Sequence, residues 1–260
     1  MRIVVCVKHV PDLQSTRGFT AEHRVVRSAD DGTMNEVDEN AVEAALALVA
    51  AAGDGEHEII ALTLGPDVAA DAVRRALQMG ADRGIRITDD ALAGADYFGT
   101  ATALAAAIRR IGDVDVVLTG MAALDGLGAV VPSLLAAALD LPQLTVVQEL
   151  TYSDGALIAR RELDGVTETL RATLPAVVAV TDLANTPRLP KFKEIMAARA
   201  KEIEVLGAAD LGLADGASTN RTEVLRTDPR PPRPEPEIVT DSDSSGGRAL
   251  ADYLISNDLI

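Results

Sequence analysis

A tight turn followed directly by a buried strand constrains this chain more than any other feature. Asp164-Gly165 is a strong signal for a two-residue hairpin, because a type I′ turn needs positive φ at both central positions. After the turn, residues 166–174 alternate between a largely apolar side and a polar side, as in a strand covered on one face. Pro175 ends this strand, and residues 176–181 (AVVAVT) are apolar on both faces. The stretch therefore predicts an antiparallel hairpin that leads into an inner strand of a helix-covered sheet.

Composition indicates a globular chain with an acidic surface. The chain has 260 residues, of which 48% are hydrophobic, and this is enough for a substantial core. Its formal net charge of −16 argues against nucleic acid and anionic membrane as partners, since both would repel it. No apolar run reaches the roughly 18 residues that a membrane span requires. The opening MRIVVCVKHVPD does not read as a signal segment, so we expect a cytoplasmic protein without membrane insertion.

Strand-like and helix-like segments alternate in the first half of the chain. This alternation predicts a doubly wound α/β fold with a mostly parallel sheet. The expected strands are 2–8, 58–64, 84–88 and 114–120, and the expected helices are 39–53, 67–80 and 96–112. From Leu144 the pattern changes to short strands at 144–150, 156–163 and 166–172, separated by SDG and DG turns. These strands predict a small antiparallel meander.

The last part of the chain changes in composition. Residues 183–205 gather Lys and Arg on an otherwise acidic protein, and two prolines precede a helical pattern, which indicates a protruding basic surface. Residues 228–247 are rich in Pro, Ser and acidic side chains and are typical of a linker. Residues 248–260 regain helical periodicity. Because the linker isolates this helix, a partner subunit is the natural recipient of its apolar side.

A glycine-rich stretch is the first candidate ligand site. Residues 120–133 (GMAALDGLGAVVPS) lie between a strand and a helix, where open α/β sheets bind ligands, and free N–H groups there suit a phosphate. A plain turn with Pro132 at the helix start is about equally consistent with the pattern. Asn35 and Asp38 precede the first helix as candidate caps or ligand contacts. Leu64 closes the next strand at the same edge, so these segments are expected to converge on one crevice.

Catalytic and metal-binding constellations are missing from the sequence. The three histidines, His9, His23 and His57, have no metal-like spacing, and His9 is expected at the surface. The single Cys6 excludes an internal disulfide and lies among valines, which predicts a buried, unreactive thiol. No carboxylates form a recognisable acid/base pair. We therefore expect no catalytic residue and no metal, and any redox work must come from a cofactor.

The chain resembles the β subunit of electron transfer flavoprotein over nearly its whole length. The family hallmark is matched by Ala159, Arg161, Asp164, Gly165, Glu168, Leu170, Pro175, Val177 and Val178. Supporting matches are VCVKHVPD, MNEVDENAVEAAL, ALQMGADRG, LDGLGAVVPS and NTPRLPKFKEIMAARAKEIEV. The resemblance implies an adenine-nucleotide α-hydrolase-like (Rossmann-like) α/β fold. It implies a nucleotide-binding domain over residues 1–210, with the meander at 144–174 and a recognition loop at 183–205. Residues 211–260 would be a linker and C-terminal arm that contacts the α subunit.

The resemblance also implies cofactors and the residues that hold them. The α subunit would hold most of the FAD, and this chain would bind AMP in a structural role. The implied nucleotide contacts are Cys6, Asn35, Glu36, Val37, Asp38, Leu64, Gly120, Met121, Ala122, Ala123, Leu124, Asp125, Gly126, Leu127, Gly128, Ala129, Val130 and Val131. Phosphate binding would use backbone N–H groups, with Asp125 arranging the loop, and Leu13 would lie near the flavin. Some family members bind a second FAD at this site and bifurcate electrons, and that alternative stays open.

Partners follow from the same resemblance. Electrons would pass from acyl-CoA-type dehydrogenases of fatty acid β-oxidation to a quinone oxidoreductase through an α–β heterodimer. Phe192 matches the apolar anchor that docks into a dehydrogenase, with a core residue of the following helix as the alternative. Glu162 matches a carboxylate that pairs with the α subunit, with an ordinary exposed glutamate as the alternative. Two other classes remain for comparison: a stand-alone nucleotide sensor, and an ATP-using ligase or pyrophosphatase, although the chain lacks the latter's phosphate loop.

Overall fold

The structure is a computed structural model that describes residues 1–15, 17–28, 30–213, 220–228, 230–233, 235–236, 238, 240–241 and 245–260. The chain forms two compact units, Met1–Leu225 and Arg226–Ile260, and each is described by itself. The predicted linker at 228–247 lies partly outside the described residues.

A seven-stranded sheet forms the centre of the first unit. Its order is β12-β5-β4-β1-β6-β11-β7, and every neighbouring pair is parallel. The strands are β1 (Arg2–Cys6), β4 (Glu58–Leu64), β5 (Arg83–Ile87), β6 (Val116–Gly120), β7 (Gln143–Val147), β11 (Ala176–Val180) and β12 (Ile203–Leu206). The chain winds outward from β1 through β4 to β5, and then returns to β6 on the other side of β1. The predicted doubly wound α/β class is therefore confirmed, with its switch point between β1 and β6.

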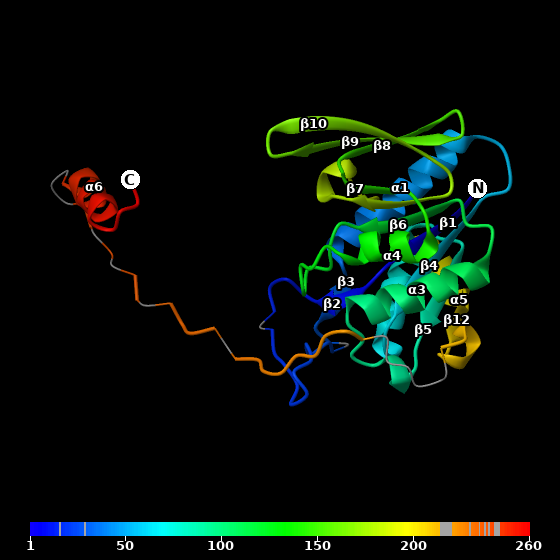
Figure 1. Ribbon diagram of the computed structural model, residues 1–260, viewed down its shortest axis with the longest axis horizontal. Helices are drawn as coiled ribbons and strands as arrows, with labels where there is room; N and C mark the ends of the chain where they lie inside the picture. Colours follow the sequence, from blue (N-terminus) through cyan, green and yellow to red (C-terminus); the bar gives the residue numbers. More distant parts are fainter. Residues whose placement is uncertain are drawn as a thin grey trace. The chain divides into compact units, whose positions relative to one another are not determined.

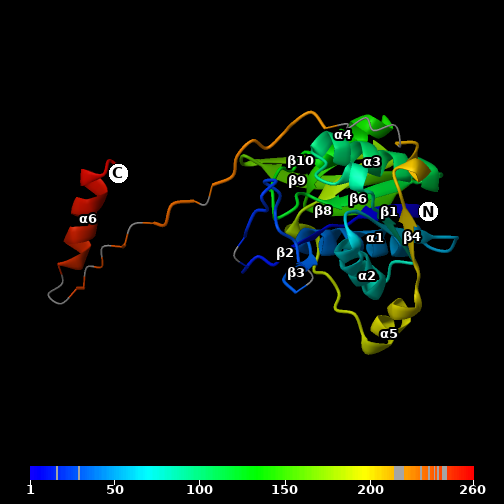
Figure 2. The same ribbon diagram turned by 90° about the horizontal axis from the view of Figure 1, so that it is seen from below.

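Helices cover both faces of this sheet, with α1, α2 and α5 on one face and α3 and α4 on the other (Figures 1 and 2). Their bounds are α1 (Glu36–Ala52), α2 (Ala70–Met79), α3 (Tyr97–Ile111), α4 (Val131–Leu139) and α5 (Phe192–Ala200). Single 3₁₀ turns lie at η1 (Asp67–Ala69), η2 (Asp90–Leu92), η3 (Asp182–Ala184) and η4 (Ala209–Leu211). Among the described residues, no helix has the length and apolar character needed to cross a bilayer.

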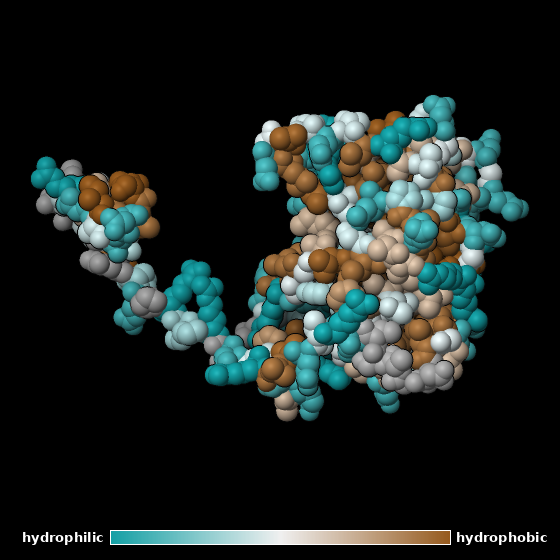
Figure 3. Space-filling model, viewed as in Figure 1, coloured by the Kyte–Doolittle hydropathy of each residue, from teal (hydrophilic) through white to brown (hydrophobic). Residues whose placement is uncertain are grey.

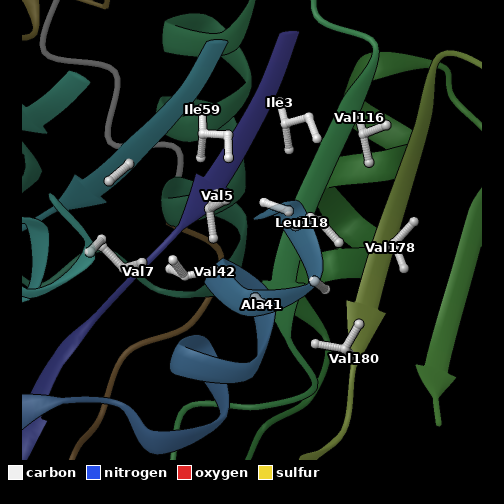
Figure 4. Close-up of a cluster of buried hydrophobic side chains, with 14 of the residues drawn as sticks. Ile3, Val5, Val7, Ala41, Val42, Ile59, Val116, Leu118, Val178 and Val180 are labelled. Atoms are coloured by element: carbon white, nitrogen blue, oxygen red, sulfur yellow. The ribbon is translucent and has the colours of Figure 1, made fainter. Parts of the chain in front are cut away.

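The core consists of two apolar layers, one on each face of the sheet. Figure 4 shows one layer, in which Ile3, Val5 and Leu118 of the sheet meet Ala41 and Val42 of α1. The opposite layer packs alternate strand residues such as Val4 and Ile60 against α3 and α4. Strand residues buried on both faces explain the continuous apolar runs in the sequence. A rigid sheet thus fixes the positions of the loops at its carboxyl edge.

The predicted hairpin is present in a separate three-stranded antiparallel sheet. Strands β8 (Glu149–Ser153), β9 (Ala156–Leu163) and β10 (Val166–Thr173) pair in the order β10-β9-β8. Asp164 and Gly165 have φ of 51° and 75°, as a type I′ turn requires. The first meander strand was misplaced: residues 143–147 join the parallel sheet as β7, and only residues 149–153 form the antiparallel edge. A short apolar run is compatible with either sheet, so the strand with which it pairs determines the sheet that it joins.

Two smaller features complete the description. Strands β2 (His9–Pro11) and β3 (Gly32–Met34) form an antiparallel pair that flanks an excursion of the chain after β1. In the second unit, the predicted terminal helix is present as α6 (Gly246–Ser256). Its side chains of Leu250, Tyr253 and Ile255 are more than half exposed. Figure 3 shows apolar and polar atoms on the same helix, so α6 presents an apolar surface within its own unit.

Candidate functional site

The site lies at the carboxyl ends of β1 and β6, where the sheet changes winding direction. Gly120 ends β6 directly against the first turn of α1. A Cβ at this position would lie 2.5 Å from Asp38 Oδ1 and 2.9 Å from the backbone carbon of Val37. Only glycine permits this approach without movement of the helix. The close packing brings the start of α1 beside the loop that follows β6.

Asp38 is the buried polar centre of this junction. Its Oδ2 accepts the backbone N–H of Lys8 at 2.9 Å, and its Oδ1 accepts the backbone N–H of Gly120 at 3.2 Å and the side-chain amide of Asn35 at 2.9 Å. Burial raises the pKa of Asp38 to about 7, against these hydrogen bonds, which lower it. One carboxylate therefore joins the segment after β1, the start of α1 and the end of β6.

Asn35 connects the same junction to the loop after β6. It occupies the cap position before α1, yet its side chain makes no capping hydrogen bond. Instead its Nδ2 donates to the carbonyl of Ala122 at 3.0 Å, and its Oδ1 accepts the N–H of Leu124 at 2.9 Å. The capping interpretation is therefore wrong for the Asn35 side chain. It holds the first part of the loop instead.

An ion-pair cluster holds the middle of the loop. The side chain of Asp125 is only 1% exposed, and its Oδ1 accepts Lys8 Nζ at 2.9 Å while its Oδ2 accepts Arg27 Nε at 2.9 Å. Burial raises the pKa of Asp125, but the charges and hydrogen bonds of Lys8 and Arg27 outweigh it and lower the pKa overall. Arg17 adds a hydrogen bond from its guanidinium to the Asp125 carbonyl at 3.4 Å. These contacts join the middle of the loop to Lys8 and to the excursion that carries Arg17 and Arg27.

The second half of the loop presents free backbone donors before α4. Within the described part of the chain, the N–H groups of Gly128, Ala129 and Val130 have no acceptor. Leu127 and Ala129 have positive φ of 50° and 53°, a conformation that is uncommon for residues with a side chain. A Cβ on Gly128 would lie 2.2 Å from the hydroxyl of Tyr97, so a larger residue there requires the half-exposed Tyr97 ring to move. Unpaired N–H groups beside a helix N-terminus suit an anionic group such as phosphate.

Other predicted contacts surround this junction with apolar surface. Cys6 ends β1 in register with Leu62 of β4 and Thr119 of β6. Burial, with a smaller contribution from Asp38, raises the pKa of the Cys6 thiol to about 12, which agrees with an unreactive thiol. Leu64 ends β4, Val37 is buried in the first turn of α1, and Glu36 is exposed beside it. The predicted crevice segments thus come from neighbouring strand ends and the first turn of one helix.

Comparison with known proteins shows the family of this chain. Residues 23–211 match the family described as Electron transfer flavoprotein domain. The chain is 39% identical to Electron transfer flavoprotein subunit beta of Mycobacterium tuberculosis (strain ATCC 25618 / H37Rv), over 99% of both chains. The chain belongs to the β-subunit family of electron transfer flavoproteins.

Two further relatives widen the family. Caffeyl-CoA reductase-Etf complex subunit CarD of Acetobacterium woodii is 33% identical, over 92% of both chains. Protein FixA of Rhizobium meliloti is 34% identical, over 98% of this chain and 90% of the relative. Electron transfer flavoprotein subunits are electron carriers, and among the described residues no cluster of His, Cys, Asp or Glu is arranged to hold a metal ion.

Three further residues predicted from the electron transfer flavoprotein resemblance lie outside this junction. Phe192 begins α5 and is 78% exposed, so it is not a core residue of that helix. Glu162 is an exposed residue of β9 in the antiparallel sheet. Leu13 is 47% exposed in the excursion after β2. Helix α5 and the β9–β10 hairpin lie well apart in both views (Figures 1 and 2), so Phe192 and Glu162 belong to separate surfaces.

Several residues that surround this junction of the electron transfer flavoprotein subunit were not predicted from the sequence. Lys8 and Arg27 pair with Asp125 across 117 and 98 residues, and no local pattern signals such pairing. The buried hydroxyl of Thr119 has no partner among the described residues. His9, expected at the surface, is 3% exposed, because β2 places it beneath the excursion with its Nε2 3.3 Å from the Ser28 carbonyl. The only sequence signal for these contacts is the pair of polar residues, Lys8 and His9, that follows the first apolar run.

Proposed function

We propose that this chain is the β subunit of a heterodimer that carries electrons from acyl-CoA-type dehydrogenases to a quinone-linked acceptor. FAD, held mainly by the α subunit, would supply the redox chemistry when bound. The observation that carries the proposal is the junction at the switch point, where Asp38 and Asn35 hold a loop whose N–H groups at residues 128–130 have no acceptor among the described residues, in a chain of this family.

We propose that this junction binds a structural nucleotide, AMP. The N–H groups of Gly128, Ala129 and Val130 would hold its phosphate, since they point to no protein acceptor. Apolar ends of β1 and β4, at Cys6 and Leu64, would border the base. The unpartnered hydroxyl of Thr119 gives the same region a free polar atom. The ion pairs of Asp125 with Lys8 and Arg27 would keep the loop in this shape, so that no side chain of the loop has to contact the phosphate.

A second FAD in place of AMP is the alternative. It is favoured by the similarity to CarD, whose name assigns it to a Caffeyl-CoA reductase-Etf complex. The same backbone donors would serve the phosphates of either nucleotide. Nucleotide content therefore distinguishes the two, and a bifurcating complex requires two FAD per heterodimer.

The docking surface is proposed on the basic segment. Leu189 and Phe192 are 82% and 78% exposed, and Lys191 and Lys193 flank Phe192 in the sequence. A small apolar surface with a basic rim suits transient docking to an acidic partner. For the α subunit, we propose contacts through Glu162 of the hairpin and through the C-terminal arm with α6.

Coexpression with an α-type subunit tests the proposal. The expected result is a yellow heterodimer that accepts electrons from an acyl-CoA dehydrogenase. A stable colourless monomer that binds a nucleotide but recruits no α subunit would favour a stand-alone sensor. ATP turnover by the isolated chain would instead favour a ligase or pyrophosphatase.

A further inference from the structure

The proposed docking segment is tied to helix α1 at two points. The first is a reciprocal pair of asparagines: Asn40 Nδ2 donates to the carbonyl of Asn185 at 2.9 Å, and Asn185 Nδ2 donates to the carbonyl of Asn40 at 3.0 Å. Asn40 is 5% exposed, and its amide also reaches the Asp182 carbonyl at 3.4 Å. A buried amide that satisfies the backbone of another segment fixes that segment in one position.

The second tie is an arginine fork on a glutamate. Arg188 Nε and Nη2 donate to the two oxygens of Glu43 at 2.7 and 2.8 Å, and the backbone N–H of Arg188 adds a third bond at 3.1 Å. The hydrogen bonds from the Arg188 side chain lower the pKa of Glu43. Bidentate pairing of this kind specifies orientation as well as distance. Glu43 therefore fixes both the backbone and the side chain of Arg188.

The two ties are placed to support the exposed apolar residues. Asn40 and Glu43 are three residues apart on α1 and so lie on neighbouring positions of one helix face. They hold residues 185 and 188, directly before Leu189 and Phe192. At the far end of α5, Arg74 Nη1 donates to the carbonyls of Ala198 and Lys201 at 2.5 and 2.6 Å. The exposed stretch is thus anchored on both sides by helices of the core.

We propose that Asn40 and Glu43 are positioning residues for docking, which hold residues 185–188 so that Leu189 and Phe192 are presented in one fixed arrangement. The inference rests on the proposed docking function. A segment already ordered before contact pays less conformational entropy on binding. This brace, formed by Asn40 and Glu43 on residues 185–188, thus raises the affinity for the electron donor without contact with the flavin. It also explains why polar groups of α1 form hydrogen bonds with an otherwise irregular segment.

The test uses the α–β heterodimer with a reduced acyl-CoA dehydrogenase as the electron donor. We expect Glu43→Gln to raise KM for the dehydrogenase by about three- to tenfold, as for loss of one charge-assisted interaction, with kcat and FAD content unchanged. Amide hydrogen exchange at Arg188 and Leu189 should become faster, while exchange in the centre of α1 stays the same. The charge-reversed pair Glu43→Arg with Arg188→Glu should restore part of the lost affinity.

Glu39→Gln is the matched control. Glu39 lies on the same helix and pairs with Arg75 Nε at 2.7 Å, with a similar partial exposure, but it contacts α2 and not the docking segment. It should leave KM unchanged. Phe192→Ala serves as the docking reference. If Phe192→Ala raises KM and Glu43→Gln does not, the brace is wrong and the docking surface stands. If neither variant changes KM, the docking surface itself is wrong and the brace falls with it. If Glu43→Gln loses FAD or does not fold, the charge-reversed pair decides. A KM in that pair as high as in Phe192→Ala, with FAD retained, would overturn the inference, because the restored ion pair would then not restore docking.

Discussion

The carboxylate of Asp38 accepts a hydrogen bond from the backbone N–H of Gly120 at 3.2 Å, across 82 residues of sequence. This bond joins the first turn of α1 to the carboxyl end of β6, where the winding of the sheet reverses. Because Asp38 also accepts hydrogen bonds from the Lys8 N–H and the Asn35 amide, this one buried side chain joins three segments at the proposed nucleotide site.

Gly120→Ala should disrupt the junction. The new Cβ would meet Asp38 Oδ1 and the Val37 backbone, so helix α1 must shift, at a cost of about 1–3 kcal/mol in the free energy of unfolding. Nucleotide retained after purification should fall with it. Gly207→Ala is the control, because Gly207 follows β12, outside the proposed nucleotide site, and the nearest atom to a Cβ there, Asp89 Oδ2, lies at an ordinary contact distance of 3.4 Å. Denaturant unfolding and nucleotide content per chain would check both variants, and equal behaviour of the two would contradict the packing argument.

Ionisation of Asp38 should make stability depend on pH near neutrality. Burial raises its pKa from 3.8 to about 7, so the folded chain binds this proton more tightly than the unfolded chain does. The folded state therefore loses stability as pH rises from about 4 to about 7. Asp38→Asn removes this titration, although it alters the hydrogen bonds by a constant amount. The stability of the variant relative to wild type should rise with pH over that range, and parallel curves in urea unfolding would show that Asp38 does not titrate there.

Removal of the Asp125 charge should loosen the loop that follows β6. Asp125→Asn leaves Lys8 and Arg27 without their shared carboxylate, and since both cations are partly exposed we expect a loss of about 1–3 kcal/mol. Glu149→Gln is the control, because its pair with Arg160 is exposed and should change stability by less than about 1 kcal/mol. Thermal unfolding and nucleotide content measure the difference. Full nucleotide retention in Asp125→Asn would mean that the ion pairs do not shape the loop.

Phe192→Ala should slow electron transfer from an acyl-CoA dehydrogenase while FAD content stays unchanged. The side chain is 78% exposed, so its removal should change stability by less than about 0.5 kcal/mol. Val205→Ala, at a 52% exposed residue of β12, is the control for loss of surface apolar area. Stopped-flow flavin reduction gives the comparison. Lost flavin in the Phe192 variant would indicate a structural residue instead.

Asp96 should hold the segment 220–222 on the start of α3. Its Oδ2 accepts the N–H groups of Arg221 and Thr222 at 2.6 and 2.9 Å, while its Oδ1 caps Gly99. Desolvation raises its pKa, but these bonds outweigh it and lower the pKa to about 2. This contribution is present above pH 4 and is lost as pH falls toward 2. Asp96→Ala should speed amide exchange at residues 221 and 222 at neutral pH, and unchanged exchange would contradict the tether.

The sequence predicted those parts of the fold that local patterns determine. Asp164-Gly165 specifies a turn with positive φ, and alternating or continuous apolar runs mark strands and helices, so the hairpin and the doubly wound sheet were recovered. The choice of pairing strand does not depend on local sequence. The Leu144–Leu150 run divides between two sheets because β11 pairs with its first half. The crevice segments were predicted from strand ends. The Lys8 and Arg27 pairing with Asp125 was not, since only the folded excursion brings these charges together.

The nucleotide stoichiometry of the intact heterodimer is the sharpest test of the proposed AMP site. The complex with the α subunit would be denatured, and its released nucleotides would be identified and counted by mass spectrometry. We expect one FAD and one AMP per heterodimer, with AMP lowered in Gly120→Ala and FAD retained. Two FAD and no AMP would contradict the structural AMP and favour the bifurcating alternative. A heterodimer without any second nucleotide would contradict the nucleotide site itself.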